Sequence, residues 1–204
     1  MWVRVGWSDE LSAYAGHGEV YVTRRAKEVL HPDCMIPIFK EYSSCMMWSM
    51  ISIHEKGPLV IFEKSWCTNL KGTVGSGVYT KYILPHISAF QESYRRRAAE
   101  VRAGAGAGLG AGGDFIYMED NSAIHSSKLT TAAYQALGIS RAWWPANSPD
   151  LNPIENVWQL LKWRLAKRFP KTNAEVRQYL QEEWEKIEVE GSLLGSYTGR
   201  GRPY

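Results

Sequence analysis

The change of hydrophobic period along the chain is the feature that most restricts its fold. Residues 2–8 alternate apolar and polar side chains, which predicts a half-buried strand that ends at Asp9. Apolar segments at 19–23, 44–53 and 59–63 predict further strands, so the first part of the chain is expected to form a meander of three or four strands.

The second part of the chain has helical spacing with clear start and stop signals. Helices that alternate with strands predict a mixed α/β domain, in which helices pack on a central sheet. The expected elements are a helix over 79–101, a strand over 114–120, a helix over 126–137 that stops at Gly138, a strand over 139–144, a helix that starts at Pro153 after the cap Asn152, and a helix over 172–187 capped by Thr172 or Asn173.

The length of 204 residues fits one domain, which we expect over residues 1–187. The Gly- and Ala-rich run 103–113 predicts a flexible loop inside this domain, and residues 188–204 predict a disordered tail. No apolar run approaches the roughly 20 residues of a membrane span, so no membrane partner is expected. Three widely spaced cysteines indicate reduced thiols in an intracellular protein, and a net charge of +3 permits a nucleic-acid partner without requiring one.

Three acids stand out by their positions. Asp9 and Asp120 each close an apolar strand, and Glu155 lies at the start of an amphipathic helix. Ligands of open α/β sheets bind beyond the carboxyl ends of strands, so these carboxylates can converge on a hard cation such as Mg²⁺. The pattern alone leaves other roles open, because an Asp after a strand is commonly a turn residue and Glu155 can close a capping box with Asn152. Asp150 is an alternative third acid.

Three segments of the sequence resemble mariner-superfamily transposases, which are cut-and-paste enzymes with a catalytic triad of two Asp and one Glu. They are WSDELSAYAGHGEVYVTRR (7–25), YMEDNSAIH (117–125) and WWPANSPDLNPIENVWQLLKWRL (143–165), in the order of that family. The second Asp and the Glu differ by 155 − 120 = 35 positions, a spacing characteristic of one large branch. The resemblance extends over residues 2–66 and 114–187, and several ordered blocks are more specific than a single motif.

This resemblance implies a ribonuclease-H-like fold, with a mixed central sheet flanked by helices. It implies that Asp9, Asp120 and Glu155 are the catalytic residues and hold two Mg²⁺ or Mn²⁺ ions. The implied activity is DNA cleavage and strand transfer on transposon ends and target DNA, in the nucleus, with a homodimer as a possible assembly. Full-length members carry helix-turn-helix modules before the catalytic domain, and we expect this chain to lack them.

Other polar residues near the triad are expected to bind DNA or to pack. The basic residues Lys162, Arg164, Lys167 and Arg168 follow Glu155 and are predicted to bind the DNA backbone, with a solvated helix face as the alternative. His125 is predicted to contact DNA or brace the acidic residues, with a capping or packed role as the alternative.

The residues adjacent to the triad are predicted to have structural roles. Glu10 and Glu119 are expected to point to the opposite sides of their strands and not to bind metal. Trp143 and Trp144 are expected to pack in the core, with stacking on an unpaired base as the alternative.

The sequence leaves two alternatives to the transposase hypothesis. A structure-selective nuclease related to ribonuclease H would share the carboxylates on a sheet but has no reason to carry SPDLNPIENVW. A catalytically silent transposon remnant, or a host-adopted copy that binds DNA or another transposase subunit, would keep the fold without the activity.

Overall fold

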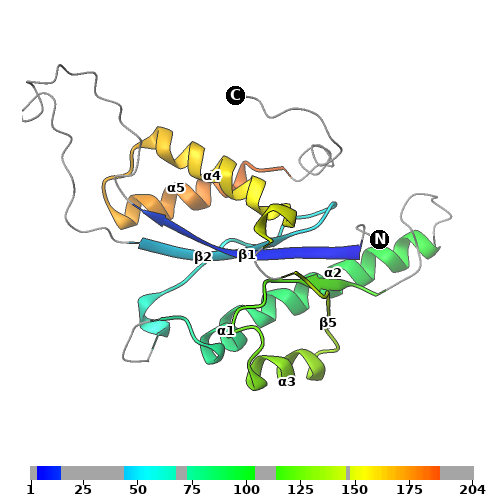
Figure 1. Cartoon of the computed structure of the whole chain (residues 1–204). Coiled ribbons are helices and arrows are strands. Elements are labelled where there is room, and N and C mark those ends of the chain that lie inside the picture. Colours follow the sequence, from blue (N-terminus) through cyan, green and yellow to red (C-terminus); the bar gives the residue numbers. More distant parts are fainter. Residues whose placement is uncertain (1–3, 15–43, 68–72, 104–113, 146–147, 189–204) are drawn as a thin grey trace, which may run out of the picture.

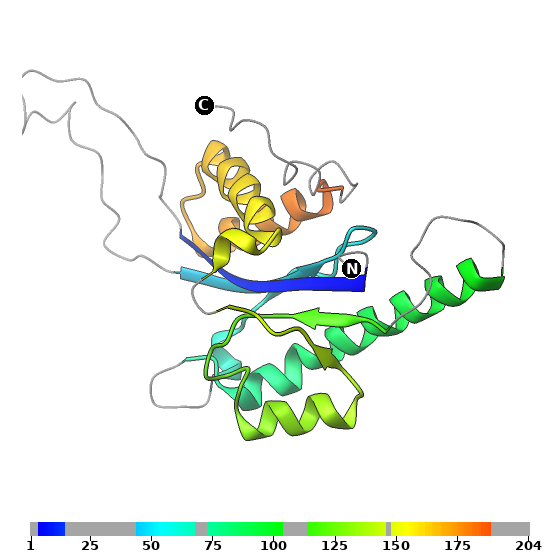
Figure 2. The same cartoon turned by 45° about the vertical axis from the view of Figure 1, so that its right-hand side comes forward.

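The computed structural model describes residues 4–14, 44–67, 73–103, 114–145 and 148–188. In this part of the chain a sheet lies between two groups of helices (Figure 1, Figure 2). In chain order the elements are β1 (Val5–Tyr14), β2 (Ser44–Ile51), β3 (Val60–Ile61), a 3-10 turn (Lys64–Trp66), α1 (Ser76–Tyr82), α2 (Leu84–Ala103), β4 (Ile116–Met118), α3 (Lys128–Ala136), β5 (Ser140–Arg141), a second 3-10 turn (Pro149–Leu151), α4 (Ile154–Arg168) and α5 (Asn173–Glu185).

The sheet is mixed, with the strand order β3-β2-β1-β4-β5. The strands β1, β2 and β3 pair antiparallel, which confirms a meander of three strands. The strands β4 and β5 then pair parallel on the other side of β1. The strand β1 is therefore central in the sheet. The helices α4 and α5 cover one face of the sheet, and α1, α2 and α3 cover the other.

The predicted end of the first strand at Asp9 is wrong, because β1 continues to Tyr14. The parallel partner β4 stops at Met118, which pairs with Trp7. The antiparallel partner β2 continues beyond that point and pairs along β1 as far as Tyr14. Asp9 thus lies within a strand, at the place where one of its two neighbouring strands has ended.

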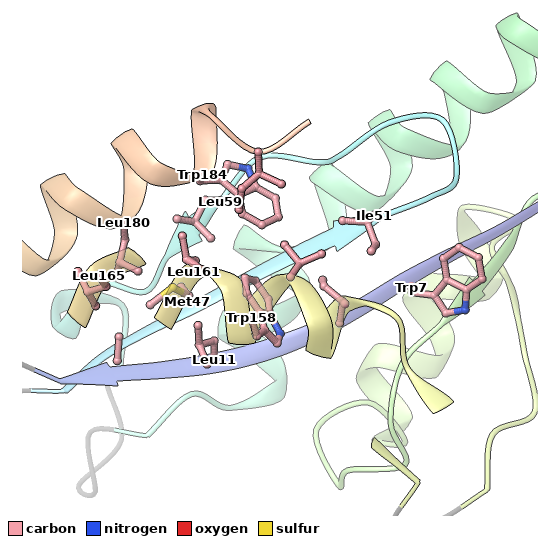
Figure 3. Packing of buried hydrophobic residues seen from close by; sticks show 14 of the residues in the cluster. Trp7, Leu11, Met47, Ile51, Leu59, Trp158, Leu161, Leu165, Leu180 and Trp184 are labelled. Atoms are coloured by element: carbon pink, nitrogen blue, oxygen red, sulfur yellow. The ribbon is translucent and has the colours of Figure 1, made fainter. Parts of the chain in front are cut away.

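Each face of the sheet has its own apolar cluster. Val5, Trp7 and Leu11 of β1 belong to the cluster beneath α4 and α5, whereas Phe115 and Tyr117 of β4 belong to the cluster on the side of α1, α2 and α3. Figure 3 shows the first cluster, where side chains of α4 and α5 lie against β1 and β2. Burial of the apolar side of α4 holds this helix on the sheet. The position of α4 matters because the helix carries Glu155.

The helix boundaries follow the sequence signals with two exceptions. The predicted start at Pro153 after the cap Asn152 is wrong, because α4 begins at Ile154 with Pro153 as its N-cap and no side-chain cap, while the Asn152 side chain donates to the Ser8 carbonyl. Residues 79–101 form parts of two helices, α1 and α2, with a break at Ile83. Pro85 has no N–H to donate to the carbonyl of Lys81, so one uninterrupted helix cannot form there. The predicted stop at Gly138 is confirmed by its positive φ of 60°, and Thr172 is the predicted cap of the last helix, since its side chain accepts from the backbone N–H of Glu175.

Some predicted segments lie outside the described residues. They are the strand at 19–23, residues 104–113 of the predicted loop, and residues 189–204 of the predicted tail. Within the described ranges, every helix is too short or too polar to cross a membrane.

Candidate active site

The register of β1 and β4 brings Asp9 and Asp120 to one face of the sheet. Trp7 pairs with Met118, and each acid follows its paired residue by two positions. Side chains two positions apart in extended backbone point to the same face, and Trp7 and Met118 both belong to the cluster beneath α4. The two carboxylates therefore emerge beside α4, at the carboxyl end of β4.

The start of α4 brings Glu155 to the same place. The buried Asn152 side chain donates from Nδ2 to the Ser8 carbonyl over 3.1 Å, which ties the residues before α4 to β1 next to Asp9. The backbone N–H of Asn152 donates to the Pro149 carbonyl over 2.9 Å, so it is not held by Glu155 in a capping box. The Glu155 carboxyl instead shares a hydrogen bond with Asp9.

The three acids line one cavity of about 500 Å³. Glu10, Trp144 and Asn152 also contribute to its wall, whereas Asp150 does not. The geometry therefore favours Glu155 over Asp150 as the third acid. The predicted trio comes from β1, from the segment after β4 and from α4, which are far apart in the sequence.

Asp9 is in an environment that disfavours its charge. Burial and the nearby charges of Glu10 and Glu155 raise its pKa to about 8, although the backbone N–H of Glu10 donates to it over 2.8 Å. The carboxyl therefore tends to hold a proton. A cation placed between these acids would relieve the same repulsion.

Asp120 has the opposite environment. A hydrogen bond of 2.7 Å from His125 Nδ1 lowers the pKa of Asp120, and the backbone N–H of Ser122 adds a second hydrogen bond at 3.0 Å. Burial alone would lower the pKa of His125, but its hydrogen bonds to Asp120 and Glu10 raise it to about 10. Both ring nitrogens face carboxylate oxygens, an arrangement that favours the cationic imidazole.

Glu119 lies on the opposite face of β4 from Asp120, as predicted. Its carboxylate is buried among polar groups of α1, α3 and β5, and burial raises its pKa. Tyr79 and Tyr134 donate to Oε2 over 2.8 and 2.7 Å, and Arg141 forms an ion pair with Oε1 at 2.9 Å. These contacts join the end of β4 to α1, α3 and β5, and Glu119 does not line the cavity.

Glu10 starts on the predicted side of its strand but still reaches the site. Its side chain starts on the face opposite Asp9, yet its carboxylate reaches the cavity wall and accepts from His125 Nε2 over 3.3 Å. Strand alternation predicted the direction of Glu10 correctly. It could not reveal that β4 ends beside it and leaves room for the side chain to reach the cavity edge.

The donor set of the cavity suits a hard divalent cation. Its charged atoms are the carboxylate oxygens of Asp9, Glu10, Asp120 and Glu155, and Asp9 and Glu155 are within hydrogen-bonding reach of each other. Within the described segments, no group of three His, Cys, Asp or Glu side chains is arranged so that it could hold a metal ion by itself. The arrangement is an open acidic wall, and Mg²⁺ usually takes one or two carboxylates together with water and substrate phosphate oxygens.

The predicted DNA-binding basic residues separate into two pairs on α4. Arg168 pairs with Glu182 and Glu183 of α5 at 2.5 and 3.2 Å, and Arg164 is 3.8 Å from Glu183. These two arginines therefore join α4 to α5. Lys162 and Lys167 are exposed, and among the described residues no carboxylate pairs with either of them; the Lys167 ammonium lies 3.4 Å from the centroid of the Trp163 ring.

The remaining predicted residues have distinct surroundings. His125 is 3% exposed and both ring nitrogens have partners within the protein, so this geometry favours the bracing role over contact with DNA. Trp144 packs in the core at the cavity wall, as expected. Trp143 is 84% exposed and does not pack in the core.

Comparisons with known proteins place the chain in a family. The family described as DDE superfamily endonuclease matches residues 81–189, which is more than half of the chain. The Tc1 transposase of Caenorhabditis elegans is 25% identical over 190 residues, which cover 91% of this chain and 60% of that protein. The Tc3 transposase of the same organism is 39% identical over 77 residues, or 36% of this chain and 23% of that protein.

Solved structures show the same fold. The catalytic domain of the Mos1 mariner transposase has a TM-score of 0.61 at 15% identity, over 96% of this chain and 76% of that one. A Mos1 mariner paired-end complex with Mn has a TM-score of 0.66 at 16% identity, over 97% of this chain and 52% of that one. The predicted ribonuclease-H-like fold is therefore confirmed. The chain spans at most 60% of the length of these curated relatives.

Proposed function

We propose that this chain, which belongs to the DDE superfamily endonucleases, is the catalytic domain of a transposase that cleaves DNA and joins the cut end to a target in the nucleus. The observation that carries the proposal is the meeting of Asp9, Asp120 and Glu155 on the wall of one cavity. Their elements are separated in the sequence, and the sequence resemblance selects the same three residues independently.

The proposed reaction is phosphoryl transfer in two stages. In the first, a water oxygen attacks the phosphorus at the transposon end, the P–O3′ bond breaks, and the 3′-oxygen leaves as a hydroxyl. In the second, that hydroxyl attacks a target phosphodiester, forms a new P–O bond and releases a target 3′-hydroxyl. Little covalent chemistry falls to side chains in such reactions, so the protein acts mainly by positioning and charge.

The acids are proposed to hold Mg²⁺ or Mn²⁺ against the reacting phosphate. The bound cation supplies positive charge that offsets the charge developing on the phosphate oxygens. Asp9 and Asp120 belong to the sheet side of the cavity and Glu155 to α4. The ligands of the cation would therefore come from two layers of the fold. Complexes of the Mos1 transposase with Mg or Mn are among the structurally similar proteins, which supports this choice of ion.

Nicking of supercoiled plasmid DNA tests the proposed function. We expect the purified chain to nick DNA weakly in Mg²⁺ or Mn²⁺, with little sequence preference and not at all in EDTA. The variant Asp120→Asn should not nick under any of these conditions. If Asp120→Asn nicks as well as the parent, the catalytic assignment is wrong; if the folded parent binds Mn²⁺ without nicking, the catalytically silent alternative is favoured.

Lys162 and Lys167 are proposed to bind DNA phosphates beside the acids. Lys162 follows Glu155 by seven positions, which is about two helical turns and brings it to nearly the same side of α4. Its side chain therefore lies on the side of α4 that carries Glu155, about 10 Å further along the helix axis. Arg164 and Arg168 face α5 and are proposed to stabilise the packing of the two helices instead.

Two double variants separate these roles while each removes two positive charges. We expect Lys162→Gln with Lys167→Gln to lower the slope of log affinity against log salt by about two, because each lost phosphate contact lowers it by about one. We expect Arg164→Gln with Arg168→Gln to change the slope far less and to lower the melting temperature. Filter binding at several salt concentrations and thermal melting measure the two effects, and equal slope changes would contradict the assignment.

A further inference from the structure

The Asp120 side chain is half exposed, yet the protein holds it in one orientation. Its side chain is 59% exposed, so burial alone does not restrict its rotation. Two donors reach the same oxygen, Oδ1: His125 Nδ1 at 2.7 Å and the Ser122 N–H at 3.0 Å. The Ser122 side chain is a third hydrogen-bond partner of this carboxylate. The His125 and Ser122 N–H contacts both hold Oδ1, so the carboxylate is anchored through that oxygen.

His125 can anchor the carboxylate because the imidazole is itself fixed. The ring is buried, and its centroid lies 4.7 Å from that of the Tyr79 ring. Its Nε2 reaches Glu10 Oε1 at 3.3 Å, and Nδ1 also lies 3.8 Å from Glu119. Glu119 is in turn held by two tyrosine hydroxyls. A chain of buried contacts thus runs from α1 and α3 to the exposed acid.

We propose that His125 is a positioning residue that holds Asp120 by Oδ1, so that Oδ2 is presented to the cavity for a divalent cation. The proposal rests on the proposed function, because it assigns Asp120 as a cation ligand. Partners that orient a ligating group commonly contribute 10- to 100-fold to metal affinity. His125 acts through Asp120 and touches neither the cation nor the DNA.

Replacement of His125 by Asn and by Gln tests which nitrogen matters. The amide nitrogen of Asn lies two bonds beyond Cβ, as Nδ1 does, and can donate to Asp120. The amide nitrogen of Gln lies three bonds beyond Cβ, as Nε2 does, and is directed toward Glu10. Both variants remove the ring and its charge, so they form a matched pair that differs in the contact preserved.

The readout is Mn²⁺ affinity of the whole chain without DNA, measured from the electron paramagnetic resonance signal of free Mn²⁺. We expect His125→Gln to weaken binding by about 10- to 100-fold and His125→Asn to stay within about threefold of the parent. Equal affinities of the two variants would overturn the proposal. Thermal melting of both variants checks that the comparison is made between folded proteins.

A second measurement uses the parent ring and holds even if both variants unfold. We expect the nitrogen resonance of His125 Nδ1 to shift in Asp120→Asn and that of Nε2 to shift in Glu10→Gln. If the Nδ1 chemical shift of His125 is the same in Asp120→Asn as in the parent, the proposal is overturned.

The outcomes for the two proposals are distinguishable. A chain that shows the Asn–Gln difference in Mn²⁺ affinity but never nicks DNA supports the role of His125 and contradicts the proposed function. A chain that nicks DNA but shows no such difference supports the proposed function and contradicts the role of His125.

Discussion

Replacing Asp9 by Asn is expected to lower the rate of DNA cleavage strongly while leaving the metal-free protein at least as stable as the parent. Burial and the neighbouring acids Glu10 and Glu155 raise the pKa of Asp9 to about 8, so an ionised carboxylate is unfavourable here without a cation. Asn has nearly the same shape but no charge. It removes this cost and, with it, the attraction for the cation, so cleavage should fall on the order of 10³-fold.

The unfavourable charge of Asp9 should make the stability of the metal-free protein depend on pH. The folded pKa of Asp9 lies above the ordinary value of 3.8, so the fold favours the protonated carboxyl. In EDTA the parent should therefore lose stability as the pH rises from about 4 toward about 8, and Asp9→Asn should lack this loss. The difference between the melting temperatures of variant and parent should grow over that range.

Plasmid nicking and thermal melting in EDTA measure the two halves of the prediction. Asp114→Asn is the matched control, because this exposed residue lies just before β4 and outside the cavity wall. The control should cleave DNA and melt like the parent. Cleavage by Asp9→Asn at the parental rate, or a variant that becomes relatively less stable as the pH rises, would contradict the proposed environment of Asp9.

Truncation of Trp158 to Ala is expected to lower the free energy of unfolding by about 3–5 kcal/mol. The Trp158 side chain is 1% exposed and lies against β1, with its ring centroid 5.7 Å from that of Trp184 in α5 (Figure 3). Alanine would leave a cavity that the sheet and α5 cannot fill without moving. Because α4 also carries Glu155, DNA cleavage should fall along with stability.

A second tryptophan on the same helix provides the control. Trp163 is 57% exposed, so Trp163→Ala should change the free energy of unfolding by less than about 1 kcal/mol. Denaturant titration of both variants measures the difference. Similar losses would mean that α4 is not held on the sheet by the face that Trp158 occupies.

Much of the fold and of the acidic site follows from local patterns in the sequence. Alternation fixes which side chains of a strand share a face, so it predicts that Asp9 and Glu10 separate and that Glu119 points away from Asp120. The stop at Gly138 and the cap at Thr172 are equally local, because each depends on the conformation of a few consecutive residues. The family resemblance adds the order of the elements, and with it the identity of the three acids.

The tertiary structure decides the features that depend on which elements meet. The continuation of β1 beyond Asp9 requires β2 to extend past the end of β4, and no local pattern contains that register. The four basic residues of α4 look equivalent in the sequence, but α5 brings carboxylates to Arg164 and Arg168 and leaves Lys162 and Lys167 exposed. Periodicity sets the direction of a side chain along its own element. Its partner, its burial and its charge state are set by the element that packs against it, and that contact forms between residues more than a hundred positions apart in the case of His125 and Glu10.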